Sequence, residues 1–107
     1  GRPLGEAIAD AGGVQTARRA LAALHPHHAI PLNASRLFFV AFGQMWCSKG
    51  HPGAEAQAAA EDRHPPGAFR TNGVVSQNGD FAAAFECASG APMNPLHKCT
   101  LWPDTGT

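Results

Sequence analysis

The fold is decided by the longest apolar run of the chain, Leu37-Phe38-Phe39-Val40-Ala41-Phe42. Together with Met45 and Trp46, the run predicts a helix from Arg36 to about Cys47, capped at its start by Asn33 or Ser35. Apolar side chains occupy nearly every face of such a helix, so it should be buried on most sides. The run is far shorter than the ~20 residues that span a bilayer.

Two further helices are expected on either side of this run. Apolar residues at steps of three and four predict an amphipathic helix from Leu4 to Leu24, which Pro26 ends. Within it, Gly12-Gly13 should mark a helix break or a place where another backbone comes close. A short third helix is expected over residues 81–86, capped from within residues 76–80.

Long ordered loops account for the rest of the chain. Proline and glycine predict a loop from Ser48 to Pro66, with one helical turn near Ala54 to Ala60, and irregular structure from Cys87 to Thr107. An extended stretch is expected from Ala68 to Val75. The predicted fold class is therefore mainly α, with three helices and long loops. Two other helices cannot cover the second one on all sides, so something else should cover it.

Composition narrows the classes of function. The chain has 107 residues, 44% of them apolar, and eight basic against eight acidic side chains. This excludes a disordered chain and makes nucleic-acid binding and direct lipid binding poor hypotheses. Three cysteines, an odd number, leave at least one without a partner inside the chain if it forms disulfides. Asn33-Ala34-Ser35 would be a glycosylation site in a secreted chain.

Two groups of polar residues are candidates for chemistry. Glu6 and Asp10 are four residues apart and share one helix face. They are either two solvated acids, or a metal-binding Glu followed by an Asp that orients another ligand. His64 lies in a Pro-Gly loop between Asp62 and Arg70, and is either a structural residue or a positioned hydrogen-bond donor.

Other metal sites are weaker alternatives. The loop that carries His25, His27 and His28 has no nearby acid or cysteine, so a solvated loop is the preferred interpretation. Two pairs, Cys47 with His51 and His97 with Cys99, could form a zinc knot, but structural zinc sites usually show paired Cys-x-x-Cys spacing. The sequence contains no nucleophile elbow, phosphate loop, dinucleotide glycine pattern or His-Glu-x-x-His.

Five blocks of sequence then follow one another in a fixed order. They are Glu6-Ala7-Ile8-Ala9-Asp10-Ala11-Gly12-Gly13, residues 37–47, residues 62–70, Phe81 through Cys87, and Met93-Asn94-Pro95 with Lys98-Cys99 and Leu101-Trp102. In this order and spacing they resemble the carboxyl-terminal end of the neprilysin and endothelin-converting-enzyme family of zinc metallopeptidases. The family consists mostly of type II membrane ectopeptidases that cut oligopeptides on the amino side of apolar residues. Its ectodomain is largely helical, with a thermolysin-like catalytic half.

The resemblance implies a role for each candidate residue. Glu6 matches the third protein ligand of the catalytic zinc, and Asp10 matches the acid that orients a zinc-bound His. His64 matches the imidazole that stabilises the tetrahedral intermediate, and Asp62 matches the acid that supports it. Arg70 matches the guanidinium that holds a backbone carbonyl of the substrate.

The resemblance also implies what lies outside the chain. Cys47, Cys87 and Cys99 match cysteines whose partners lie upstream, as do the two zinc-binding His and the catalytic Glu. Residues 1–102 are then the C-terminal part of a catalytic domain, and residues 103–107 are a tail beyond the usual family end. The partners implied are oligopeptide substrates and the remainder of the parent polypeptide, with a membrane reached only through an N-terminal anchor.

From these assignments we expect a C-terminal fragment of a Zn²⁺-dependent metalloendopeptidase, located at the extracellular face of the plasma membrane or secreted. By itself the chain should neither hold zinc tightly nor cleave peptides, because it has one of three zinc ligands and no general base. Two rival hypotheses are an inactive pseudo-peptidase that acts as a binding protein and a small secreted binding module.

Overall fold

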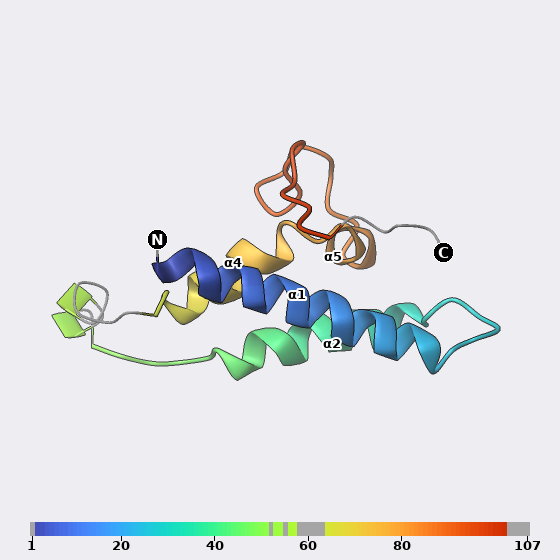
Figure 1. Ribbon diagram of the computed structural model, residues 1–107, viewed down its shortest axis with the longest axis horizontal. Helices are drawn as coiled ribbons and strands as arrows, with labels where there is room; N and C mark the ends of the chain where they lie inside the picture. Colours follow the sequence, from blue (N-terminus) through green and yellow to red (C-terminus); the bar gives the residue numbers. More distant parts are fainter. Residues whose placement is uncertain (1, 52, 55, 58–63, 103–107) are drawn as a thin grey trace.

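The computed structural model describes residues 2–51, 53–54, 56–57 and 64–102, and it is helical (Figure 1). Its helices are α1 (Arg2–Ala23), α2 (Leu32–Met45), α4 (Gly67–Val75) and α5 (Gly79–Ala84). The described residues contain no strand, so the mainly α class is confirmed. No helix in this part of the chain has the length and apolar character needed to cross a membrane.

Helix α1 runs without interruption through Gly12-Gly13, so the predicted helix break is wrong. A side chain, not a backbone, comes close at this point. A Cβ added to Gly12 would lie 2.9 Å from Cζ3 of the Trp102 ring. The side-chain amide of Gln15 donates a hydrogen bond to the carbonyl oxygen of Trp102 at 3.1 Å. The glycine therefore leaves room for the last described residue to rest on α1.

Helix α2 begins at Leu32, four residues earlier than predicted. Pro31 occupies the N-cap position and no side chain caps the helix, so the predicted cap by Asn33 or Ser35 is wrong. Proline can begin a helix because its fixed φ suits the first turn and it has no N–H to leave unpaired. Ser35 is buried inside the helix, and the Asn33 side chain accepts a hydrogen bond from the neighbouring N–H of Ala34.

The expected burial of α2 on most sides is not met within the described residues. Phe39 is 3% exposed, whereas Leu37 is 66% and Met45 is 74% exposed. One face of α2 therefore packs inside the chain, and its other face is open.

Helix α4 replaces the extended stretch predicted for Ala68 to Val75, and this prediction is wrong. Its β-branched residues and Gly73 disfavour a helix by intrinsic propensity. Burial overrides that preference, because Val74 and Val75, at the end of α4, are 5% and 3% exposed. Pro66 precedes the helix, and its carbonyl oxygen accepts a hydrogen bond from the N–H of Arg70 at 3.0 Å, which closes the first turn.

Helix α5 confirms the predicted cap within residues 76–80. The side chain of Asn78 accepts hydrogen bonds from the N–H groups of Asp80 and Phe81, at 2.9 and 3.2 Å. At the other end, Nε of Arg36 donates to the carbonyl oxygen of Ala84 at 2.6 Å. Residues 87–102 contain no regular element, as the sequence predicts.

The core brings all of these helices together. Helices α1 and α2 run in opposite directions along the molecule (Figure 1), and α4 packs against both of them. The buried cluster takes one or two residues from each helix: Val14, Phe39, Val74, Val75 and Ala84. Because α4 lies against both long helices, its first turn meets the beginning of α1 and the end of α2.

Candidate active site

The candidate site lies where the beginnings of α1 and α4 meet. Glu6 and Asp10 are one turn apart on α1, and their carboxylates reach the same partner, Arg70 of α4. The predicted common face of Glu6 and Asp10 is therefore confirmed. Asp10 and Glu6 come 60 and 64 residues before Arg70 in the sequence, and the three side chains meet at this point.

Arg70 makes a two-pronged contact with Asp10. Nε donates to Oδ2 and Nη2 donates to Oδ1, both at 2.7 Å. Nη2 also lies 3.0 Å from Oε2 of Glu6. The hydrogen bond to Asp10 is the main cause that raises the pKa of Arg70. Burial opposes this rise, and the charges of Asp10 and Glu6 add to it. Arg70 is thus a fixed cation that holds two carboxylates in place.

A third element closes the site from the side of α2. Trp46 follows the last residue of α2, and Cζ of Arg70 lies 3.9 Å from the centroid of its ring. From the sequence, Trp46 was expected only as an apolar residue of the second helix, with no part in the site. The residues next to Trp46 in the sequence give no sign of a contact with Arg70, because Arg70 lies 24 residues further along the chain and on another helix.

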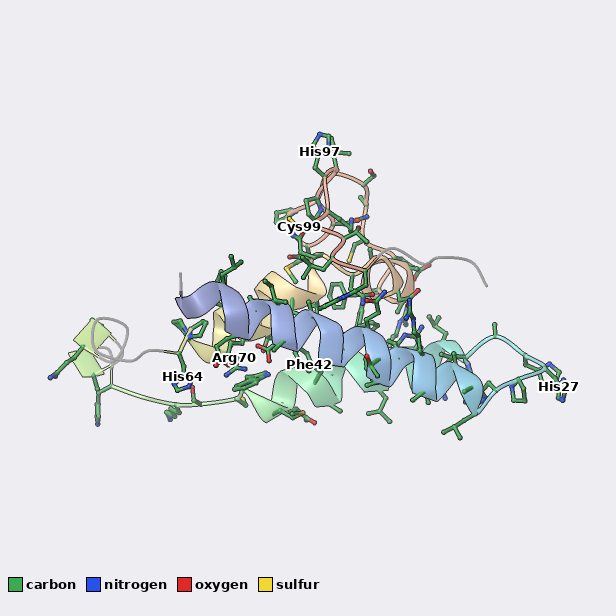
Figure 2. All side chains as sticks on the ribbon, viewed as in Figure 1. His27, Phe42, His64, Arg70, His97 and Cys99 are labelled. Atoms are coloured by element: carbon green, nitrogen blue, oxygen red, sulfur yellow. The ribbon has the colours of Figure 1, made fainter. Side chains whose placement is uncertain are left out.

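His64 lies at the open side of the site. Its Nε2 is 4.0 Å from Oε1 of Glu6, and its side chain is 61% exposed. His64, Trp46 and Arg70 also line one groove of about 920 Å³, which continues along Pro66 and Thr71. Figure 2 shows His64 and Arg70 near one another, at the end of the molecule opposite His27. The groove could hold an extended peptide against these side chains.

The structure does not gather the other candidates. Asp62 lies outside the described residues. Cys47, Cys87 and Cys99 are unpaired with one another in the described chain. His97 and Cys99 lie in the C-terminal loops, away from His64 and Arg70 (Figure 2). No group of three or more His, Cys, Asp or Glu side chains suited to a metal occurs among the described residues. Among the described residues, neither the zinc knot nor a metal site in the loop of His25, His27 and His28 is therefore formed.

The donors at the site suit a metal only in part. Glu6 offers a carboxylate whose Oε1 faces the open side near His64, while its Oε2 is held by Arg70. Catalytic zinc normally has three protein ligands and an open position. At this site the described residues offer one carboxylate with an oxygen toward the open side, that of Glu6, which is fewer than this number.

Known proteins resemble this chain in sequence. A sequence model of peptidase family M13 matches residues 2–101. Human endothelin-converting enzyme 1 is 40% identical over 106 residues, and so is endothelin-converting enzyme-like 1 of Rattus norvegicus. Endothelin-converting enzyme 1 of Bos taurus is 39% identical over the same length. No solved structure matches the chain.

The chain belongs to peptidase family M13, and the resemblance to the neprilysin and endothelin-converting-enzyme family is confirmed. The match covers 92% of this chain but only 14% of the human relative. The chain thus spans about a seventh of the length of the curated relatives that it matches.

Proposed function

We propose that this chain is one segment of a Zn²⁺-dependent metalloendopeptidase that hydrolyses oligopeptides, and that it supplies one wall of the active site. The observation that carries the proposal is the meeting of Glu6, Asp10, Arg70 and His64 at one end of α1. These are residues that the family resemblance assigns to one catalytic centre. Two unrelated solvated acids would not share one nearly buried arginine, whose side chain is 13% exposed.

Glu6 is the residue that would hold zinc, together with two ligands from outside this chain. Bound zinc would polarise the scissile carbonyl and lower the pKa of its water. Arg70 holds Oε2 of Glu6 at 3.0 Å, and this contact fixes the carboxylate before any metal arrives. Asp10 anchors Arg70 and, in the parent enzyme, would also orient a zinc-bound imidazole.

His64 and Arg70 act on the substrate. His64 would donate a hydrogen bond to the oxygen that becomes negative when water adds to the scissile carbonyl, and Asp62 would support that imidazole. Such donors are placed for charge that develops in the transition state. Arg70 would hold a backbone carbonyl of the peptide in the groove, in the ground state as well as in the transition state.

The setting of the parent enzyme is also a proposal. Its substrates would be oligopeptides cut on the amino side of apolar residues. The open face of α2 would be covered by the remainder of the polypeptide, and Cys47, Cys87 and Cys99 would form disulfides with it. The enzyme would act outside the cell, secreted or held by an N-terminal anchor, with Asn33 as an exposed glycosylation site.

The test places this chain into human endothelin-converting enzyme 1, in exchange for the segment that it matches. We expect this chimera to bind zinc and cleave a quenched oligopeptide. Glu6→Gln should lower turnover at least ~100-fold and lower zinc content, because loss of even outer-shell partners of a metal costs ~10–100-fold. Glu86→Gln makes the same chemical change at a side chain that is 80% exposed, and it should leave both unchanged.

Normal turnover and full zinc content in Glu6→Gln would overturn the proposal. A second readout uses the 107-residue chain alone. It should retain no stoichiometric zinc after dialysis and show no cleavage that a chelator inhibits.

A further inference from the structure

Arg70 is bounded on two sides by different kinds of contact. Asp10 and Glu6 bind nitrogens at the edge of its guanidinium group, and Cζ lies over the Trp46 ring, 3.9 Å from the ring centroid. We propose that Trp46 is a positioning residue: its ring fixes the orientation of the Arg70 guanidinium plane, and so sets how Arg70 faces the groove. The structural part stands alone, and only its consequence for substrate binding rests on the proposed function.

Hydrogen bonds to the edge do not fix the plane by themselves. Nε and Nη2 both bind the Asp10 carboxylate, which sets their positions but permits the guanidinium to tilt about the line that joins them. Because Cζ is only 3.9 Å from the ring centroid, tilting toward the ring would press a guanidinium nitrogen against it, so the ring blocks tilting toward that side. The attraction between a guanidinium and the negative face of an aromatic ring also favours the stacked orientation.

The chain brings Trp46 to this position through the contact between α2 and α4. A Cβ on Gly67 would lie 2.6 Å from the carbonyl oxygen of Trp46 and 3.3 Å from its Cβ, so the first turn of α4 abuts the end of α2. Gly67 and Arg70 are three residues apart on α4 and share a face. Because Gly67 touches the Trp46 backbone, Arg70 is brought over the Trp46 ring.

Trp46 contacts Arg70 through the face of its indole ring, and its Nε1–H group takes no part in this contact. Nε1 of Trp46 is buried and has no hydrogen-bond partner among the described residues. A phenylalanine would therefore retain the useful part of this side chain, whereas a leucine would fill space without offering a negative face. Trp46 also lines the groove beside Arg70 and His64, so a direct contact with substrate is the rival explanation that the test must separate.

The test measures kcat and KM for Trp46→Phe and Trp46→Leu in the chimera described above, each with and without Arg70→Ala. We expect Trp46→Leu to raise KM about 10-fold with a smaller change in kcat, and Trp46→Phe to stay within about 3-fold of the parent. In the Arg70→Ala background, Trp46→Leu should raise KM no further, because contacting residues that act as one unit are not additive.

A KM increase that persists in the Arg70→Ala background would show that Trp46 contacts the substrate itself, and would overturn the proposal. If the leucine variant does not fold, tryptophans carrying increasing numbers of fluorine atoms at position 46 keep the shape and weaken the negative face. KM should then rise with each added fluorine, and an unchanged KM would overturn the proposal.

A readout without activity separates this proposal from the proposed function. A crystal structure of a folded Trp46→Leu variant, or of the most fluorinated variant, should show Arg70 tilted away from its parent orientation while Asp10 keeps its place. An unaltered guanidinium plane would overturn the positioning role. If the parent chimera is inactive, the proposed function fails, but this structural comparison still decides the role of Trp46.

Discussion

Two nearly buried arginines, one packed against the beginning of α1 and one in the second half of α1, differ in how their charge is compensated. The side chains of Arg70 and Arg18 are 13% and 12% exposed, and both lie near aromatic rings. Arg70 has carboxylate contacts at 2.7–3.0 Å from two side chains. Arg18 has one, to Asp80 at 3.5 Å, and its Nε and Nη1 have no hydrogen-bond partner among the described residues.

The difference shows which of the two arginines is held in a fixed orientation. A buried cation is stabilised only when its hydrogen-bonding groups are satisfied, and each unmet group carries a desolvation cost. The end of α1 with Arg70 meets this condition through contacts among its own side chains. The end with Arg18 does not meet it within the described residues. Fixed orientation of polar groups is what a catalytic site requires, and it occurs at the Arg70 end.

The largest expected effect tests whether the Arg70 end carries chemistry. His64→Ala in the chimera should lower kcat about 100- to 1000-fold and leave KM nearly unchanged, because the imidazole acts on charge that develops after water attacks. The control is His27→Ala, at the opposite end of the molecule in Figure 2, which should change neither constant. Steady-state kinetics on folded, zinc-loaded protein that show an unchanged kcat for His64→Ala would end the catalytic interpretation of this loop.

The next effect compares the two arginines directly. Arg70→Lys should raise KM about 10- to 100-fold, because an ammonium cannot reproduce the planar two-pronged contact with Asp10. Arg18→Lys removes the same kind of group at the other end and should leave kcat and KM as they are. Equal losses of peptide binding in the two variants would remove the distinction between the two ends.

A smaller effect concerns the two adjacent glycines of α1. Gly13 has no atom within 4 Å of an added Cβ, so Gly13→Ala should raise the free energy of unfolding by up to ~1 kcal/mol through helix propensity. Gly12→Ala places its Cβ 2.9 Å from the Trp102 ring and should gain less or lose stability. Denaturant titration of both variants gives the difference. Equal gains would show that Trp102 does not rest on α1 in solution.

The smallest effect concerns the partner of Arg18. Asp80 is 62% exposed and lies 3.5 Å from Nε of Arg18, so Asp80→Asn should change the free energy of unfolding by about 0.5 kcal/mol or less. Its matched variant is Asp10→Asn, whose 11% exposed carboxylate holds Arg70 at 2.7 Å and which should destabilise the chain more. Denaturant titration in which Asp80→Asn is the more damaging change would reverse the ranking of the two ion pairs.

Local signals in the sequence located much of the helical structure. The three- and four-residue spacing of apolar residues gave α1 and the common face of Glu6 and Asp10. The polar cluster before Phe81 contained the cap of α5, which Asn78 provides. These features depend on neighbours within one or two turns, and such neighbours can be recognised in the sequence alone.

The errors have one physical origin. Residues 68–75 were predicted to be extended, but burial of Val74 and Val75 makes them helix α4. The Gly12-Gly13 pair was expected to break α1 or to lie against another backbone, but α1 continues and the Trp102 side chain lies against Gly12. Trp102 comes 90 residues after Gly12 in the sequence. Propensity is a weak local preference, and long-range packing overrides it.

By itself, the sequence determined the mainly α class, the membership in peptidase family M13 and the register that puts Glu6 and Asp10 on one face of α1. Only the tertiary structure decided that Arg70 joins both carboxylates and that its Cζ lies over the Trp46 ring. The reason is that helix periodicity and motif order are written along the chain. The contacts of Arg70 exist only after α4 has packed between the beginning of α1 and the end of α2.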